Sequence, residues 1–397
     1  MPQHPNHGYL YRAQRVFLYM GFAYAALVTL MVTPFFQLHA IYLHSVRWPP
    51  FAKFDAPEKY GLAPGKALNV KFSTSDNETI GAWFVLCDSY YHSIASPVDP
   101  VALSTEHVRS SLQSHPTIIF LHGNAATRAV QFRVQHYSSF SSRLGANVLV
   151  IDYRGFADST GNPSEAGLVR DTRAAWDWLR ERGAKGEDVL VVGHSLGTGV
   201  ATRFVKELED GGEKPRGMVL LAPFRSIRAV LDTYLILGFF PLIKPLRNIP
   251  GVADIVLSFL AHHFDTSSII SEIKSPILLA HAEDDWDIPY THSEILFNSI
   301  LDTHLPHLPE LPKSASEISQ LSKDDWSDYV SAQSMRKALL AQLVTETNIP
   351  GFGTIQEVRR GNGDGKVVFV KSLWGGHDRI GLMEGVQDAI GRTFEMF

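Results

Sequence analysis

The longest apolar run without a charge lies near the N-terminus. Residues 16–36 read VFLYMGFAYAALVTLMVTPFF, and a helix of this length spans roughly 30 Å, the thickness of a bilayer's hydrocarbon core. One alternative is a cleaved signal peptide, whose small-x-small site at residues 23–25 would fall inside the run. The other is a buried helix of a soluble domain. The length and the lack of charge favour a membrane anchor at residues 16–36, preceded by a tail of residues 1–15.

Beyond this anchor, short apolar runs alternate with stretches of helical period. Residues 37–65 show no periodicity, and we expect them to form a linker. The runs that follow are typical of strands, and the first two should pair antiparallel; they are residues 68–73, 79–86, 117–121, 147–152, 188–192, 218–221, 277–280 and 366–370. Helical patterns lie between or after them, at residues 128–144, 165–182 and 384–394. This alternation predicts an α/β fold with a mostly parallel sheet covered on both faces, in one domain of residues 66–397.

Two inserts depart from this alternation. Residues 225–264 are rich in Leu, Ile and Phe and fall between two core strands, where a cap over an active site would lie. The alternatives are a helical excursion buried against the core and an acyl-chain pocket that dips into a membrane surface. Residues 302–350 begin as a surface loop rich in Pro, then Ser, Lys and Asp, and continue with a helix-like segment, 328–345. The Gly-rich stretch 361–365 is better explained as a hairpin turn than as a calcium loop.

The overall composition narrows the possible functions. The chain has 397 residues, of which 45% are hydrophobic and 19% charged, and its net charge is −5. This mildly acidic balance gives no electrostatic footprint for nucleic acid. Cys87 is the only cysteine, so no intrachain disulfide can form, and we expect it to be a small core residue. The basic residues that flank the anchor are nearly balanced, and the sequon at residues 77–79 favours a luminal domain only slightly.

The strongest chemical signal is the sequence GHSLG at residues 193–197, with Ser195 at its centre. The apolar run 188–192 precedes it, and the helix-like stretch 198–210 follows it. This is the strand–turn–helix context of a nucleophile elbow, in which the glycines avoid collisions with the neighbouring strand and helix. The alternative is a coincidental glycine-flanked turn. We expect Ser195 to be a nucleophile.

A serine nucleophile needs a base, and that base needs an acid to orient it. The sequence HAEDDWDIP at residues 281–289 follows a strand and fits the acid-bearing turn H-G-x-x-D-x-x-V-P. The spacing selects Asp285 as the acid, with Asp284 and Asp287 as alternatives. His281 is expected to be a structural residue at the end of the strand.

The base is expected in a loop after the last strand. His377 lies in such a loop, followed by a helical pattern, and it is the only one of 17 histidines in that position. The order Ser195, Asp285, His377 along the chain is the order found in α/β-hydrolases.

An oxyanion hole needs two backbone N–H donors directed at the position where negative charge develops. One should be the amide of Leu196, directly after the nucleophile. The other should come from the turn after the third strand, LHGNA at residues 121–125, where we assign the amide of Asn124. The side chain of His122 is expected to pack and to hydrogen-bond. Such a site needs no metal and no organic cofactor.

Four stretches together resemble the family of membrane-anchored α/β-hydrolase domain-containing protein 12. They are FLHGNA (120–125), IDYRGFADS (151–159), GHSLGTGVAT (193–202) and HAEDD (281–285). The resemblance covers about residues 66–300 and the histidine loop. It implies a single N-terminal anchor and a lipase that acts on lysophospholipids, notably lysophosphatidylserine, and on monoacylglycerols, with its site on the luminal or extracellular side. The triad positions that it implies agree with Ser195, Asp285 and His377.

Two features depart from the family's pattern. Ala157 stands where glycine or a similar small residue is common, a change that we expect to be harmless. The insert at 302–350 lengthens the distance between acid and base, and it could reshape the entrance of the pocket.

We therefore predict a single-pass membrane serine hydrolase with an α/β-hydrolase fold and a helical cap. It should cleave carboxylic esters of monoacyl lipids through an acyl-enzyme, with the lipid ester and the membrane as its partners. We expect it in the endoplasmic reticulum, with a luminal catalytic domain. One rival is a protein-palmitoyl thioesterase, although the cysteine-rich N-terminus frequent in that class is missing. A rival from another class is a catalytically silent membrane scaffold, against which the complete set of candidate catalytic residues argues.

Overall fold

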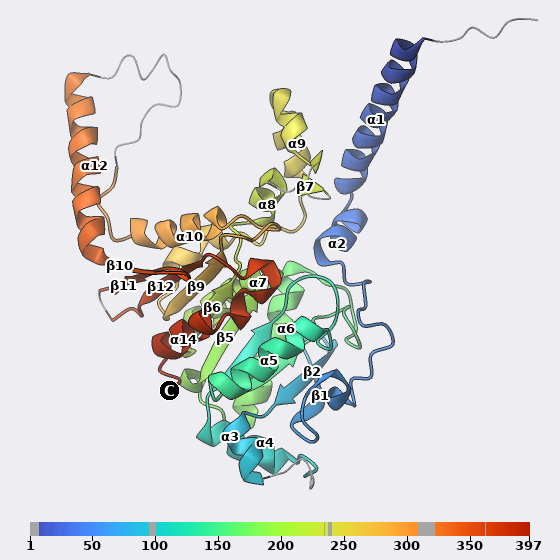
Figure 1. Cartoon of the computed structure of the whole chain (residues 1–397), viewed down its shortest axis with the longest axis vertical. Coiled ribbons are helices and arrows are strands. Elements are labelled where there is room, and N and C mark those ends of the chain that lie inside the picture. Colours follow the sequence, from blue (N-terminus) through green and yellow to red (C-terminus); the bar gives the residue numbers. More distant parts are fainter. Residues whose placement is uncertain (1–7, 95–100, 234, 237–239, 309–321, 362) are drawn as a thin grey trace, which may run out of the picture.

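Ten strands form one continuous sheet through the centre of the molecule (Figure 1). This computed structural model describes residues 8–94, 101–233, 235–236, 240–308, 322–361 and 363–397. The strand order is β1-β2-β4-β3-β5-β6-β9-β12-β11-β10, and the six strands from β4 to β12 are parallel. Their bounds are β1 (Ala67–Ser73), β2 (Thr79–Val85), β3 (Thr117–Leu121), β4 (Asn147–Ile151), β5 (Val189–His194), β6 (Gly217–Leu221), β9 (Ile277–Ala282), β10 (Val344–Ile349), β11 (Gly353–Val358) and β12 (Val367–Ser372).

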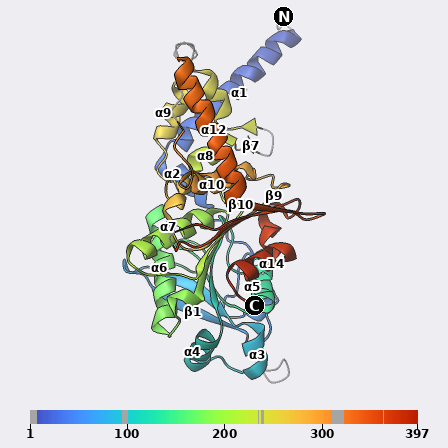
Figure 2. The same ribbon diagram turned by 90° about the vertical axis from the view of Figure 1, so that its left-hand side faces the viewer.

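Helices cover both faces of this sheet, so that its central strands are buried along their whole length. Successive residues of β5 point to opposite sides: Val189 and Val191 into one core, Leu190 and Val192 into the other. The first core contains residues of α6, α7 and α10, and the second contains residues of α5 and α14 (Figure 2). The prediction of a mainly parallel sheet covered on both faces is confirmed.

Short helices complete the domain. Cys87, expected in the core, is fully buried just after β2. The helices of the domain are α3 (Asp88–Ile94), α4 (Thr105–Ser114), α5 (Gln131–Arg143), α6 (Glu165–Glu181), α7 (Leu196–Asp210), α10 (Thr291–Asp302), α13 (Gly376–Arg379) and α14 (Glu384–Thr393). Single 3-10 turns occur at η1 (Pro57–Tyr60), η2 (Gly186–Asp188), η4 (Thr266–Ser268), η5 (Ile270–Glu272) and η6 (Ile380–Leu382).

Two edge strands were not predicted from the pattern. β10 and β11 form an antiparallel hairpin that extends the sheet beyond β12. The sequence pattern predicts a helix at 328–345, whereas α12 spans Lys323–Leu343 and the chain then enters β10. Because every side chain of β10 is exposed or half-buried, its sequence VTETNI lacks the apolar alternation of a strand. The predicted turn at 361–365 joins β11 to β12, and its residue 362 lies outside the described residues.

The N-terminal helix α1 spans Tyr9–Met31 and none of its residues is buried. By length and composition it is a candidate membrane span. It begins before the uncharged run at residue 16 and ends before residue 36, because Pro34 opens a second helix, α2 (Pro34–Tyr42). Proline is common in the first turn of a helix, because the backbone N–H that it lacks would have no partner within the helix there. Residues 1–7 of the predicted tail lie outside the described residues.

The segment after α2 is attached to the sheet by backbone hydrogen bonds. The amides of three consecutive residues, 125–127 in the loop after β3, donate to the carbonyl oxygens of Tyr42, Val46 and Trp48, at 2.9, 2.8 and 3.0 Å. This part of the predicted linker therefore lies against the turn in which an oxyanion donor was expected.

The cap insert has a small core of its own. It consists of α8 (Ile227–Thr233), the two-residue strands β7 (Leu235–Ile236) and β8 (Phe240–Pro241), the 3-10 turn η3 (Lys244–Asn248) and α9 (Val252–Ser258). Its buried residues, such as Leu246 and Leu257, pack on one another and on Tyr24 and Val28 of α1 rather than on the sheet. Residues 234 and 237–239 lie outside the described residues. Ile227 and Val230 of α8 pack against the main core instead, so the insert has a small core of its own and also contacts the domain beneath it.

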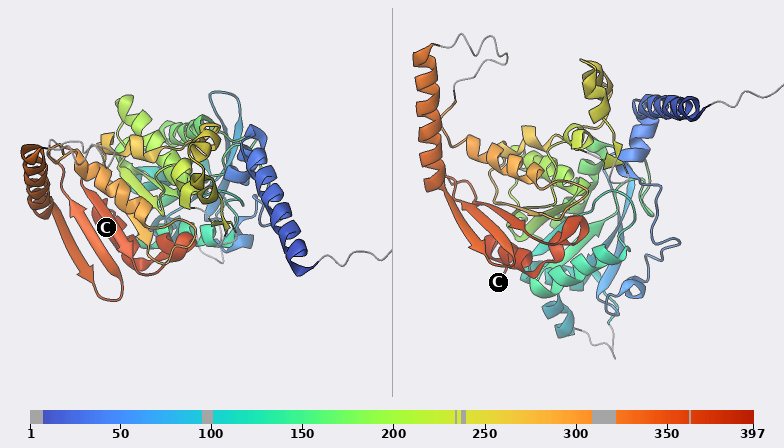
Figure 3. Two further views of the ribbon diagram at one scale, coloured as in Figure 1. Left: turned by 90° about the horizontal axis from the view of Figure 1, so that it is seen from above. Right: turned by 45° about the horizontal axis from the view of Figure 1, so that its top comes forward.

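Seen from above, the cap lies between α1 on one side and α12 on the other (Figure 3). α12 stands away from the sheet, and none of its residues is buried. The first part of the second insert, residues 309–321, lies outside the described residues.

Candidate active site

Ser195 occupies a strained turn between β5 and α7. Its φ is 52° and its ψ is −120°, a conformation that L-residues rarely adopt. A side chain on Gly193 would collide with the backbone of Gly197, and one on Gly197 would collide with the carbonyl of Leu121. The two glycines thus let the turn pack between β3 and α7, and the turn holds the Ser195 hydroxyl at the carboxyl edge of the sheet.

The loop after β12 brings His377 to this serine. The Ser195 hydroxyl lies 2.8 Å from Nε2 of His377, positioned to donate its proton to that nitrogen. The opposite nitrogen, Nδ1, donates to Oδ2 of Asp285, also at 2.8 Å. Residues far apart in the sequence thus form one continuous relay from hydroxyl to imidazole to carboxylate.

Asp285 is held in place from several sides. Its Oδ1 accepts the backbone amides of Asp287 and Ile288, each at 2.9 Å. Its Oδ2 also accepts from Nε2 of His281 at 3.0 Å. His281 is fully buried at the end of β9, so this histidine orients the carboxylate and does not face the serine.

The two alternative acids have other positions. Asp284 accepts the backbone amide of Gly376 at 2.7 Å, which fastens the loop that carries His377. Asp287 is exposed at the rim of the site. Asp285, Asp287 and His377 offer ligand atoms within 4.8 Å of one another, as a metal site would. However, both ring nitrogens of His377 and both oxygens of Asp285 are already hydrogen-bonded, so binding an ion there would break the relay.

Burial and hydrogen bonding set the charges of the relay. Burial raises the pKa of Asp285, but hydrogen bonds from His281 and His377 outweigh it and hold the pKa well below its usual range. Burial lowers the pKa of His377, but the hydrogen bond and negative charge of Asp285 outweigh it and raise the pKa above its usual value. The pair therefore consists of an ionised carboxylate and an imidazole of increased basicity.

The two residues expected to supply the oxyanion donors lie at the cavity in front of the serine. Asn124 and Leu196 both line this space, and within the part of the chain that the structure describes neither amide donates a hydrogen bond. Leu196 is the first residue of α7, where the helix dipole favours negative charge. Ala125 and Ala126, which follow Asn124, adopt left-handed backbone angles with φ of 56° and 52°. An oxyanion hole requires amides without another acceptor, and among the described residues both of these amides meet that requirement.

Arg133 is a residue of this site that the sequence pattern did not reveal. Its guanidinium is buried, and Nη2 donates to the carbonyls of Gly123, Asn124 and Ala125 at 3.3, 3.0 and 2.9 Å. The carbonyl of Gly123 and the amide of Asn124 belong to one peptide unit, so the bond from Arg133 fixes the position of that amide as well. The sequence shows Arg133 only as one residue of a predicted helix at 128–144. Because its partners are backbone atoms, no motif of side chains marks its role.

His194 is the second residue that the pattern did not reveal. Its Nε2 donates to the backbone carbonyl of His377 at 2.9 Å. Burial lowers the pKa of His194 well below its usual value, so its ring is neutral at physiological pH. The only sequence signal was its place beside Ser195.

His122, expected to pack and hydrogen-bond, is fully buried, and its Nδ1 donates to the carbonyl of Gly123.

Ser195 and His377 face a cavity of about 410 Å³, here named the Ser195 cavity. Apolar residues form most of its wall; they are Ile41, Leu43, Ala125, Ala126, Phe132, Leu196, Phe224, Ile227, Val230 and Ile288. None of the described residues of the insert 302–350 lines it. Ala157, also singled out, has a φ of 46°, in the left-handed region that favours glycine.

The sequence of this chain is similar to those of known proteins. Residues 118–358 match the Alpha/beta hydrolase family. The chain is 32% identical to lysophosphatidylserine lipase ABHD12 of Danio rerio over 297 residues, which cover 73% of each chain. It is 32% identical to the protein of the same name from Gallus gallus, over 74% of each chain. It is 37% identical to human Protein ABHD12B over 186 residues, 46% of this chain and 49% of that one.

Solved structures with a similar arrangement are more distant. An esterase of Pyrococcus furiosus is 17% identical with a TM-score of 0.44, over 65% of this chain and 84% of that one. An alpha-beta hydrolase of Vibrio vulnificus is 16% identical with a TM-score of 0.46, over 76% and 94%.

Proposed function

Because this chain belongs to the Alpha/beta hydrolase family and, within it, to the ABHD12 proteins, we propose that it is a membrane-bound serine hydrolase of monoacyl lipids. It cleaves the carboxylic ester of a lysophospholipid or a monoacylglycerol. Lysophosphatidylserine is the first substrate to test, because the relatives are named for it. The observation that carries the proposal is the relay from Ser195 through His377 to Asp285 at the floor of an apolar-walled cavity.

In the first half-reaction, Ser195 Oγ attacks the ester carbonyl as its proton passes to Nε2 of His377. Asp285 holds the imidazole in the required tautomer and stabilises its charged form. The amides of Asn124 and Leu196 donate to the oxyanion of the tetrahedral intermediate. That intermediate collapses by breaking the bond to the alcohol oxygen, which takes its proton from His377, and the acyl group remains on Ser195.

In the second half-reaction, a water molecule gives a proton to His377 and attacks the acyl carbonyl. The same two amides stabilise the second oxyanion. The bond to Ser195 Oγ then breaks, His377 returns the proton to the serine, and a fatty acid leaves. The sequence of steps uses only side chains and backbone groups of this chain, without a metal or an organic cofactor.

The test is hydrolysis of a matched panel by detergent-purified protein. The panel contains lysophosphatidylserine, lysophosphatidylcholine, a monoacylglycerol and an acyl-thioester peptide. We expect turnover of the monoacyl lipids well above that of the thioester, and a loss of roughly 10⁶-fold in kcat in Ser195→Ala with the fold intact. Retention of more than a few per cent of activity in that variant contradicts the role of Ser195.

The panel also separates the rival functions. Preference for the thioester would identify a protein-palmitoyl thioesterase. A silent scaffold would hydrolyse nothing, and a fluorophosphonate would not label it, whereas we expect labelling of the wild type and none of Ser195→Ala.

The location in the endoplasmic reticulum with a luminal catalytic domain is part of this proposal. Asn77 supports it, since the asparagine of the sequon lies exposed in the turn between β1 and β2, where a glycosylating enzyme can reach it. We expect endoglycosidase H to increase the mobility of the protein from microsomes but not that of Asn77→Gln. Digestion of the domain by protease added outside intact microsomes would contradict this orientation.

A further inference from the structure

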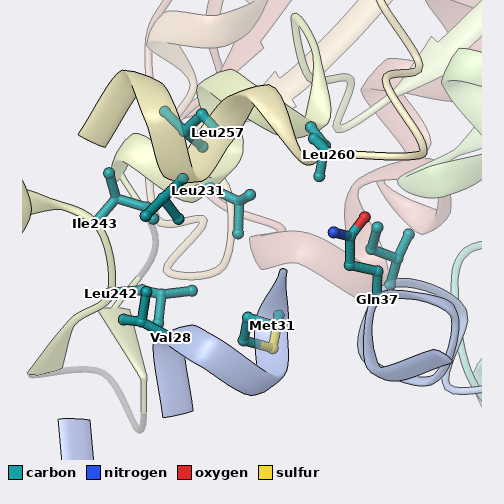
Figure 4. A pocket seen from close by; sticks show the side chains of 10 residues that line it. Val28, Met31, Gln37, Leu231, Leu242, Ile243, Leu257 and Leu260 are labelled. Carbon is teal, nitrogen blue, oxygen red and sulfur yellow. The ribbon is translucent and has the colours of Figure 1, made fainter. Parts of the chain in front are cut away.

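A second cavity lies where the membrane anchor meets the cap. It has a volume of about 40 Å³ and is here named the anchor cavity. Val28 and Met31 of α1 line one side, and Leu242, Leu257 and Leu260 of the cap line the opposite side. Figure 4 shows these side chains directed toward a common space, with Gln37 at one end.

The described lining of the anchor cavity offers no free polar group. Gln37 is the one polar residue among the described residues that line it. Its Nε2 donates to the carbonyl of Phe259 at 2.8 Å, and its Oε1 accepts the amide of Ala261 at 2.8 Å. Both ends of this amide are therefore used to fasten α2 to the cap. A cavity of this chemistry accommodates hydrocarbon and excludes charged or hydrogen-bonding groups.

The cap packs against the C-terminal part of α1, the candidate membrane span. Tyr24 in the anchor donates its hydroxyl to the carbonyl of Leu242 in the cap at 2.7 Å. Tyr24 precedes Met31, the last residue of α1, by about 10 Å along the helix axis. The cap is therefore packed against the final turns of the membrane span. It exposes Ile255 and Phe259, which are 62% and 58% accessible, on its surface.

One wall separates the anchor cavity from the Ser195 cavity. Ile41 of α2 lines both of them. Val230 and Leu231 are neighbours on α8, and Val230 lines the Ser195 cavity whereas Leu231 lines the anchor cavity. The two spaces are thus adjacent, and side chains of α2 and α8 divide them.

We propose that the anchor cavity is the narrow part of a route by which the acyl chain of a single-chain lipid ester passes from the bilayer to Ser195. The anchor helix forms one wall of this route and the cap forms the other. At about 40 Å³ the cavity holds only a short length of hydrocarbon. The rest of the chain extends into the bilayer along α1 on one side and past Ile41 on the other. The proposal rests on the proposed lipid hydrolysis at Ser195, and it makes the membrane anchor a part of the substrate-binding site.

The first test fills the cavity and compares chain lengths. Leu257→Trp and Val28→Trp place an indole in the anchor cavity from the cap and from the anchor. Ile255→Trp and Leu30→Trp are matched controls on the same two helices, at exposed positions. We expect kcat/KM for a monoacylglycerol with a long chain to fall roughly tenfold in the cavity variants, the effect of about two displaced methylene groups. The two controls should keep the wild-type turnover of both this ester and p-nitrophenyl acetate, whereas the cavity variants should lose more activity on the long ester than on p-nitrophenyl acetate. If kcat/KM depended on acyl-chain length in the same way in the cavity variants and in the controls, the proposal would be overturned.

The second test measures occupancy without activity. A lysophosphatidylcholine with a photoreactive diazirine in the middle of its acyl chain is irradiated with Ser195→Ala in lipid nanodiscs. We expect labelled peptides that contain residues 28–31 or 256–260, and loss of this labelling in Leu257→Trp but not in Ile255→Trp.

The two tests fail differently. If these residues are labelled but the wild type cleaves no monoacyl lipid, the anchor cavity binds an acyl chain and the proposed hydrolysis is wrong. Lipid hydrolysis that depends on Ser195, with labelling confined to other residues, would keep the hydrolysis and reject the route.

Discussion

Two layers of this molecule meet at the Ser195 cavity, and they are built by different forces. The catalytic floor consists of the loops at the carboxyl ends of β3, β5, β9 and β12, which carry Asn124, Ser195, Asp285 and His377. The membrane-facing roof consists of residues 24–43 and the cap, which contact each other mainly through aliphatic side chains. Hydrogen bonds fix direction and distance in the floor, whereas apolar contacts in the roof fix only shape and volume.

The floor and the roof therefore have different roles in the reaction. The floor can place a proton acceptor 2.8 Å from a hydroxyl because each group has a defined partner. The roof can accept chains of different length because dispersion contacts have no directional requirement. Substitutions in the floor should therefore reduce turnover of every ester, whereas substitutions in the roof should act according to the length of the acyl chain.

Among substitutions that separate floor from roof, we expect the largest effect from Asp285→Asn. The asparagine amide cannot stabilise the imidazolium and favours the wrong tautomer of His377, so kcat should fall by roughly 10⁴ for long and short esters alike. Steady-state kinetics on both substrates measures this. Asp284→Asn is the matched control, since its side-chain oxygen can still accept the amide of Gly376. It should retain activity within about threefold. A chain-length-dependent loss in Asp285→Asn would break the division between floor and roof.

Arg133→Met should give the next largest effect. The carbonyls of the loop after β3 lose their donor, the amide of Asn124 loses its orientation, and kcat should fall about 10²–10³-fold with little change in KM. The control is Arg128→Met. That residue is an equally buried arginine, but it pairs with Asp152 and Asp158. It should lower stability, measured by thermal unfolding, while folded molecules keep their kcat. An increase in KM alone for Arg133→Met would show that Arg133 does not position the oxyanion donor.

The pH dependence gives a graded test of the floor. His377 acts as a base only when its ring is neutral. Burial lowers its pKa, but Asp285 outweighs burial and raises it. Activity should therefore fall about tenfold per pH unit below a midpoint that lies above the ordinary histidine value of about 6.5. The profile of kcat/KM on a short ester measures this midpoint. In Asp285→Asn the midpoint should move down, and an unchanged midpoint would show that Asp285 does not set the basicity of His377.

The smallest effect is expected in the roof, from Tyr24→Phe. This change removes the hydrogen bond from the anchor to the carbonyl of Leu242, worth roughly 0.6 kcal/mol between membrane-embedded groups. The fraction of molecules in which the cap has separated from the anchor should therefore increase about threefold. The rate of amide hydrogen exchange at residues 242–260, in protein held in nanodiscs, measures this fraction. The turnover of p-nitrophenyl acetate should not change. Tyr19→Phe, whose hydroxyl bonds Arg15 instead, should leave the cap unaffected.

Much of the floor could be predicted from the sequence because its signals are local. The parallel strands are short, continuous apolar runs, and the elbow shows its glycines beside Ser195. Spacing alone separated Asp285 from two neighbouring acids. The edge hairpin of β10 and β11 could not be found, because its half-exposed side chains show no alternation. Arg133 could not be found either, since its partners are carbonyl oxygens, which leave no trace in side-chain patterns.

The sequence by itself determined the α/β-hydrolase fold, an apolar N-terminal helix and the three residues proposed to carry the chemistry. These follow from periodicity and from turn residues, which act over a few positions of the chain. Only the tertiary structure decided that residues 42–48 pair with the loop of Asn124, and that α1 and the cap share a cavity divided from Ser195 by Ile41. These contacts join segments about 80 and more than 200 residues apart through backbone hydrogen bonds and nonspecific apolar packing. Neither force demands a particular residue type, so neither leaves a motif that can be read along the chain.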